Sequence, residues 1–282
     1  MKVRDPKWNF AEVPAHWAPI TEFAQSVNAG SLVPAYIEPF LIKVMRQALA
    51  RLDPVKHAKL RSEIEIFNLQ EGQHVKAHVA YNKTLRSQYP GMEAIESEFR
   101  AEYEHFLKDK PLKFNVAYSE GFEALGSAGS NFWLGDWGPY LEGADPNVVG
   151  MWQWHLAEEF EHRTVAFDVY KALYGNGPFA YAYRVYMFIY TFRHLMKFTN
   201  RLYELLLAKD RQGMSPDALR KSLERQKAYK KWRTKVSLRR LLAVFSPFYD
   251  PRNVPLSREW EAVLKRYPEQ QPRPAVVSSV QP

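Results

Sequence analysis

One segment of the sequence places two histidines and a glutamate on a single face of a helix. In WHLAEEFEHRTVAFD these residues are His155, Glu159 and His162, separated by four and then three positions. Residues with these offsets fall within about two turns on one stripe of an α-helix, so their side chains point the same way. Imidazole and carboxylate groups on one stripe are typical of a helix that binds metal inside a bundle. The segment therefore predicts a metal-binding helix.

A second segment repeats this arrangement. NLQEGQHVKAHVAYN carries Glu71, His74 and His78, separated by three and then four positions. A single Glu-x-x-His is weak evidence, because an isolated histidine on a helix is more often a surface or core group. Here, however, the two stripes hold four of the eight histidines in the chain. Two helices with inward-facing Glu-x-x-His motifs are what a ferritin-like bundle uses to hold two metal ions.

The absence of cysteine narrows the chemistry. It excludes disulfides, thiolate nucleophiles, iron–sulfur clusters and zinc–thiolate sites, so histidine and carboxylate are the strong metal ligands that remain. Such ligands suit iron, manganese or zinc. The sequence also has no Gly-rich phosphate loop, GxGxxG fingerprint or serine nucleophile elbow, which argues against nucleotide chemistry and against a serine hydrolase.

The pattern of apolar residues predicts an all-α protein. Together with the two Glu-x-x-His stripes it predicts a ferritin-like four-helix bundle with additional C-terminal helices. Residues 1–33 are rich in proline and aromatic residues, so we expect an extended arm. A single helical domain follows over 34–266, with the di-metal bundle over about 34–175 and the additional helices over about 178–266. Residues 267–282 have the composition of a disordered tail. The predicted helices span residues 34–52, 53–87, 92–126 with a break near Pro111, the segment around His155 as far as Gly175, 179–198 and 257–266.

A di-metal site in a four-helix bundle needs one glutamate from each of two helices and a Glu-x-x-His from each of the other two. The first predicted helix supplies Glu38, and the third supplies Glu120 among small residues that allow a neighbouring helix to approach. The predicted metal ligands are therefore Glu38, Glu71, His74, Glu120, His155, Glu159 and His162, and we assign catalytic roles to Glu71, Glu159 and His155. Two further residues, His78 and Asn82, are expected to be extra ligands or to support the ligands.

Four segments resemble a known family. They are VPAYIEPF, FNLQEGQHVKAHVAYN, AYSEGFEALGSAG and WQWHLAEEFEHRTVAFDVY, and they resemble the bacterial family described as predicted metal-dependent hydrolases over most of residues 15–265. The spacing of His155, Glu159 and His162 is also similar to that of the di-iron N-oxygenases that act on para-aminobenzoate, which carry one histidine ligand beyond the usual six. This resemblance implies a ferritin-like site that holds two iron ions, with manganese or zinc as alternatives.

The leading functional hypothesis is an O₂-activating di-iron oxidoreductase, an oxygenase (such as a monooxygenase) or an oxidase, that acts on a hydrophobic or aromatic small molecule. Because the sequence has no flavin, haem or ferredoxin motif, an external electron donor is expected. The second hypothesis is a metal-dependent hydrolase, in which the two metal ions lower the pKa of a bridging water. Iron storage or sensing is a third, weaker hypothesis, because the chain has a long aromatic and basic extension.

The net charge of +8 is concentrated in one segment. Residues 209–240 contain 12 Lys or Arg and three acidic residues, so the rest of the chain is nearly neutral. A basic helix of this kind is either solvated or in weak contact with an anionic membrane, and no nucleic-acid motif is present. The first residues lack the apolar run and small-residue cleavage site of a signal peptide, so we expect none. Cations interrupt Phe179–Phe198, so we also expect no membrane span. The expected protein is cytoplasmic, with peripheral contact to the inner membrane face and a homodimer as one form of assembly.

Overall fold

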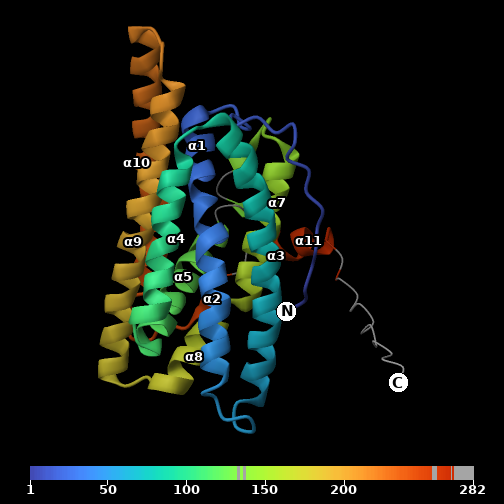
Figure 1. Ribbon diagram of the computed structural model, residues 1–282, viewed down its shortest axis with the longest axis vertical. Helices are drawn as coiled ribbons and strands as arrows, with labels where there is room; N and C mark the ends of the chain where they lie inside the picture. The colour runs from blue at the N-terminus through green and yellow to red at the C-terminus, as the bar shows by residue number, and fades with distance from the viewer. Residues whose placement is uncertain (132–133, 136–137, 256–258, 268, 270–282) are drawn as a thin grey trace, which may run out of the picture.

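The computed structural model describes residues 1–131, 134–135, 138–255, 259–267 and 269. These residues form an all-α helical bundle, which confirms the predicted fold class (Figure 1). Its α-helices are α1 (Thr21–Gly30), α2 (Leu32–Leu49), α3 (Ala58–Gln88), α4 (Met92–Asp109), α5 (Leu112–Asn131), α6 (Gly138–Leu141), α7 (Pro146–His162), α8 (Val165–Tyr174), α9 (Pro178–Asp210), α10 (Pro216–Ala243) and α11 (Trp260–Lys265).

The N-terminal segment differs from the extended arm expected over residues 1–33. Residues 1–20 contain no helix, but α1 occupies Thr21–Gly30. Helix α1 forms because Phe23, Ala24 and Val27 lie at helical spacing and are buried in the core. The prolines of the N-terminal segment all precede α1, and proline disfavours a helix interior. The residues before α1 are therefore non-helical, whereas the proline-free stretch that follows forms the helix.

Four helices enclose the predicted metal ligands. Helices α2 and α3 pack against each other along the bundle, while α5 packs on α7 and α7 also contacts α3 (Figure 1). The helix predicted over 92–126 is divided as expected, because α4 ends at Asp109 and α5 begins after Pro111. The ligand-bearing segments are thus brought together from distant parts of the chain.

The helix that carries His155 is shorter than predicted. It was expected to continue to Gly175, but α7 ends at His162 and α8 begins at Val165. The side chain of Arg163 donates hydrogen bonds to the carbonyls of Phe160 and Pro251. The Arg163 side chain thus replaces a backbone N–H as the hydrogen-bond donor to a carbonyl in the last turn of α7, so the helix can end there.

Helix α9 extends beyond the predicted 179–198 and contributes a ring-filled face to the core. Phe198 and His194 pack with Phe99, Phe106 and Tyr118 of α4 and α5. Among the described residues, every helix is too short or too polar to cross a lipid bilayer. The predicted disordered tail lies almost entirely outside the described residues.

Candidate metal centre

Helix α7 presents its ligand stripe to the interior of the bundle. Its N-terminus is fixed by Asp145, whose carboxylate accepts hydrogen bonds from the backbone N–H groups of Asn147 and Val148. From there His155, Glu159 and His162 all turn inward and are buried. The three side chains face the same interior point, as predicted from their i, i+4, i+7 spacing.

Buried donor atoms gather in two groups that share two residues. One group holds Glu38, His74, His155 and Glu159, and the other holds Glu71, His74, Glu159 and His162. In each group the ligand atoms lie within 4.8 Å of one another. His74 and Glu159 belong to both groups, so the arrangement matches two neighbouring cation positions. A carboxylate can serve two cations, so Glu159 is the ligand that both positions could share, whereas His74 could bind either cation through its one free nitrogen, Nδ1.

The distances within the groups are short enough for coordination. His155 Nε2 lies 3.1 Å from Glu159 Oε1 and 3.4 Å from Glu38 Oε1. Glu71 Oε2 lies 3.7 Å from His74 Nδ1, and Glu71 Oε1 lies 3.6 Å from His162 Nε2. Two atoms bound to one cation at about 2.1 Å can be at most about 4.2 Å apart. All of these pairs fall below that limit.

The unpaired donor atoms show that the residues fit metal ions. The buried atoms without a hydrogen-bond partner include both carboxylate oxygens of Glu38 and of Glu71, Oε2 of Glu159, Nδ1 of His74 and Nε2 of His162. Buried polar atoms are normally satisfied, so a cluster of unsatisfied oxygen and nitrogen atoms needs an explanation. Cations at the two positions would satisfy these atoms and would also offset the buried negative charge.

Each histidine of the cluster is held by a partner on its other ring nitrogen. His74 Nε2 lies 3.0 Å from Glu158 Oε2, and Glu158 in turn accepts a hydrogen bond from Arg4 of the N-terminal segment. His162 Nδ1 lies 3.1 Å from Glu123 Oε2. Such partners fix the orientation of a ligand ring and increase its basicity. The contribution of Arg4 could not be predicted from a local motif, because Arg4 lies 154 residues before Glu158 in the chain.

His78 supports His155 and is in neither group. His78 Nε2 lies 2.7 Å from His155 Nδ1, and His78 Nδ1 lies 2.8 Å from the hydroxyl of Ser31. If His155 binds a cation through Nε2, its Nδ1–H donates to His78, and His78 then donates from Nδ1 to Ser31. These two hydrogen bonds are consistent with one set of tautomers. His78 therefore lies outside the two donor groups and orients the ring of His155.

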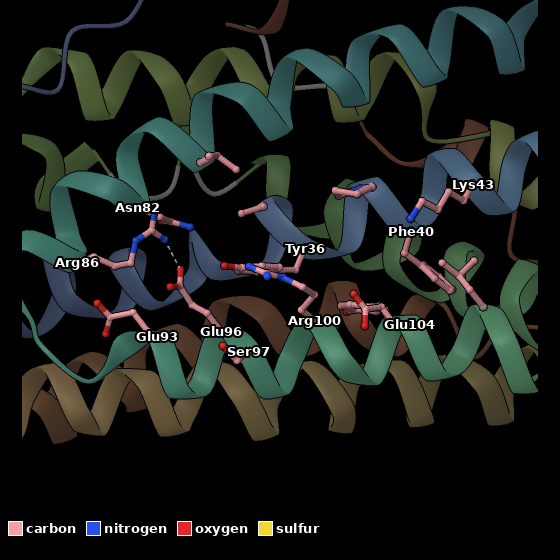
Figure 2. A pocket seen from close by; sticks show the side chains of 15 residues that line it. Tyr36, Phe40, Lys43, Asn82, Arg86, Glu93, Glu96, Ser97, Arg100 and Glu104 are labelled. Carbon is pink, nitrogen blue, oxygen red and sulfur yellow. Dashed lines mark hydrogen bonds and ion pairs between the residues drawn. The ribbon is translucent and has the colours of Figure 1, made fainter.

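Asn82 lies at the edge of a separate cavity between α2, α3 and α4. This cavity has a volume of about 520 Å³, and the ion pair of Arg86 with Glu96 and the aromatic ring of Tyr36 form part of its wall (Figure 2). Asn82 donates a hydrogen bond to the backbone carbonyl of Ser31. A chain of hydrogen bonds through Ser31 and His78 therefore joins Asn82 to the cluster, and none of the predicted metal ligands is among the described residues that line the cavity.

Glu120 lies outside both donor groups, and Glu123 is the glutamate of α5 that contacts the cluster, through His162. Glu120 is buried against Arg184 of α9, with 3.4 Å between the two side chains. Glu123 is one turn further along the helix and contacts His162. The signal in the sequence was present but ambiguous: the same helix offers two glutamates, and Arg184 within a ring-rich helix needs a buried acidic partner.

A glycine lets α5 approach α7 at the cluster. A Cβ atom placed on Gly126 would lie 2.6 Å from Glu159 Oε2, closer than real side-chain contacts allow. Any larger residue would therefore displace the shared carboxylate. The small residues of α5 were expected to permit such an approach, and at this position they do.

Aromatic rings cover the histidines. The ring of Trp152 is stacked on His155 with 5.7 Å between centroids, and Trp154 contacts His74 edge-on at 4.9 Å. Phe67 meets His162 at 4.7 Å. These rings keep the imidazoles in place and exclude water, which strengthens every electrostatic interaction within the cluster.

Burial makes Glu38 and Glu71 of the cluster, and Glu123 beside it, retain protons when no cation is bound, whereas the burial of Glu159 is outweighed by the nearby His162 and His155, which lower its pKa. Burial, together with repulsion from neighbouring carboxylates, raises the pKa of Glu38 and of Glu71 well above the usual range, and the pKa of Glu123 is raised in the same way. Since the unfolded chain releases these protons at lower pH, the metal-free fold loses stability as pH rises.

The histidines of the cluster respond to pH in the opposite direction. Burial, with repulsion from neighbouring histidines, lowers the pKa of His74 and of His78 well below the ordinary value of 6.5. Their contribution to stability is therefore lost as pH falls below 6.5, when the unfolded chain takes up protons. Above that pH these two histidines no longer contribute to the trend, and the raised pKa values of Glu38 and Glu71 make stability fall as pH rises.

A family model matches residues 2–254 of the chain, and its description is "Predicted metal-dependent hydrolase". The chain belongs to this family. Comparison with curated proteins and with solved structures finds no match. The match confirms the resemblance to the hydrolase family, while the similarity to ferritin-like proteins and to N-oxygenases stays a prediction.

Membership of this family favours the second functional hypothesis over the first. The family description names metal dependence and hydrolysis, and it does not name oxidation. The buried cluster of histidines and glutamates agrees with metal dependence. Its nitrogen and oxygen ligands suit iron, manganese or zinc.

Proposed function

We propose that the protein is a metal-dependent hydrolase whose centre binds two divalent cations between α2, α3, α5 and α7. The observation that carries the proposal is the pair of donor groups that share His74 and Glu159 and leave buried oxygen and nitrogen atoms unpaired. The family description supports hydrolysis as the reaction. When bound, the cations would supply a water molecule of lowered pKa as the nucleophile.

The residues of the chain divide into those that bind and those that hold protons. Glu38, Glu71 and Glu159 would bind the cations together with the three histidines of the two groups. Glu123 is suited to hold a proton beside the centre, because Oε1 has no partner and burial raises its pKa. A carboxyl group in this state can donate a proton to a leaving group.

The surroundings of the centre favour an apolar substrate. Trp152, Trp154 and Phe67 contact the ligand histidines, and the cluster itself is buried. A hydrophobic or aromatic ester or amide is therefore the substrate class that we propose. Apolar walls with a few placed polar groups are the usual lining of small-molecule sites.

Activity measurements on reconstituted protein test the proposal. The zinc and manganese forms are assayed with aromatic and aliphatic esters and amides, and we expect hydrolysis that is absent without metal. Glu71→Gln should abolish it, whereas the control Glu65→Gln, on the exposed face of the same helix, should not. Hydrolysis that persists in Glu71→Gln, or that needs no metal, would rule out the proposed centre.

Oxygen activation by two iron ions is the second candidate function. It is favoured by His155, a third imidazole in a cluster already rich in carboxylates, because such a ligand set suits iron. The partners would then be O₂ and an external electron donor. Oxygen uptake by the anaerobically reduced iron form, with no hydrolysis by the zinc or manganese form, would select this function over hydrolysis.

A further inference from the structure

Helices α9 and α10 border an apolar groove on the surface, far along the chain from the metal ligands. The groove has a volume of about 590 Å³, which is within the range of ligand-binding pockets. Several apolar side chains on its rim are exposed, by 36% for Phe192, 52% for Leu238 and 57% for Leu242. Exposed apolar groups gathered in one place mark an interaction surface, unlike single exposed residues.

A stripe of cations runs beside the groove on α10. Lys227, Lys231, Lys235 and Arg239 recur every four residues, so they lie along one side of the helix, and all four are exposed. Leu238 and Leu242 lie on the neighbouring stripe. Among the described residues, none of these four cations forms an ion pair, whereas Arg225 on the same helix is paired with Glu22.

The two helices also lack acidic residues along the groove. The sequence has no Asp or Glu over residues 179–203 or over residues 225–249, which include the α9 and α10 walls of the groove. Arg193 adds an exposed cation from α9 at the groove itself. Figure 1 shows α9 and α10 running side by side along one edge of the molecule, so this surface faces outward.

We propose that this face of α9 and α10 docks on an anionic lipid bilayer. The cations would lie at the level of the headgroups, while the exposed rim of Phe192, Leu238 and Leu242 would enter the acyl region beside them. A second copy of the chain fits the surface less well, because a symmetric contact would bring two basic stripes together. The inference does not depend on the reaction at the metal centre.

Sedimentation with lipid vesicles tests the electrostatic part. The full-length protein is mixed with phosphatidylcholine vesicles that either contain or lack phosphatidylglycerol. We expect binding to the anionic vesicles only, and its loss at high salt. The triple variant Lys231→Gln, Lys235→Gln, Arg239→Gln should bind about 100-fold more weakly, because each cation near such a surface contributes about five-fold. The control variant Lys56→Gln, Lys83→Gln, Lys108→Gln loses the same charge elsewhere and should bind as the wild type does.

A second pair of variants tests the apolar part. Leu238→Ser with Leu242→Ser should weaken binding to anionic vesicles, whereas Val55→Ser with Leu69→Ser, which are at least as exposed but lie elsewhere, should not. Circular dichroism checks that each variant keeps its helical content. The proposal is overturned if the wild type does not bind anionic vesicles at low salt, or if the charge variant and its control weaken binding equally. It is also overturned if the serine variants leave lipid binding intact and instead dissociate a dimer in light scattering.

Discussion

The substitution Gly126→Ala should weaken metal binding strongly while leaving the fold intact. The added Cβ would lie 2.6 Å from Glu159 Oε2, and ordinary contacts begin near 3.4 Å, so the carboxylate must shift by about 0.8 Å. Metal–ligand distances tolerate changes of only about 0.2 Å. Because Glu159 belongs to both donor groups, both cation positions are affected.

Gly126→Ala should change the free energy of unfolding only slightly, whereas it should lower the affinity for metal strongly. Crowding at a packed position typically costs about 1–3 kcal/mol. Replacing glycine inside a helix returns about 0.5–1 kcal/mol, because alanine loses less backbone entropy. The net loss of about 0–2.5 kcal/mol leaves the helical bundle folded, whereas the affinity for metal should fall by at least about 10–100-fold, as it does when a supporting group is lost.

Isothermal titration calorimetry with zinc measures the affinity, and circular dichroism follows thermal unfolding. The matched control is Gly129→Ala, three residues further along α5, where a Cβ would meet nothing within 4 Å. This control should bind zinc as the wild type does and gain about 0.5–1 kcal/mol of stability. Wild-type affinity in Gly126→Ala would refute the reasoning, because it would mean that Glu159 is not a shared ligand.

Three other outcomes follow from the same cluster. The metal-free protein should lose thermal stability as pH rises above 6.5, where the buried carboxyl groups set the trend, and saturating zinc should reverse that loss, as calorimetry at several pH values would show. Glu158→Gln should lower zinc affinity about 10–100-fold by weakening the contact to His74, whereas Glu161→Gln, whose side chain contacts no histidine among the described residues, should not. His78→Phe should leave the number of bound ions unchanged but lower the affinity of the position that His155 serves, measured by competition with a chelator.

Helical periodicity was sufficient to predict the stripes and the bundle. His155, Glu159 and His162 are close in sequence, so their common direction depends only on the geometry of one helix. The same holds for Glu71 and His74. The structure brings these five predicted residues together with Glu38, whereas metal binding itself remains a prediction.

Periodicity could not set the register between helices. On α5 it leaves Glu120 and Glu123 one turn apart, and the choice between them depends on packing. Gly126 against Glu159 and the ion pair of Glu120 with Arg184 fix that register through contacts between distant segments. No local pattern carries this information.

Groups that support the ligands were also hard to predict. Arg4 reaches Glu158 from the N-terminal segment, and Ser31 reaches His78 from the start of α2. Neither belongs to a motif, because each acts through a single long-range contact. The break between α7 and α8 has a similar origin, since Arg163 bonds to the distant Pro251 as well as to its own helix.

The metal content of the purified protein tests the central claim most directly. Protein reconstituted anaerobically with iron, and separately with zinc or manganese, is freed of loosely bound metal and measured by elemental analysis. We expect two ions per chain in the wild type and one or none in Glu159→Ala, with helical content unchanged in both. A wild-type protein that is fully helical and yet retains no metal under any of these conditions would contradict the account.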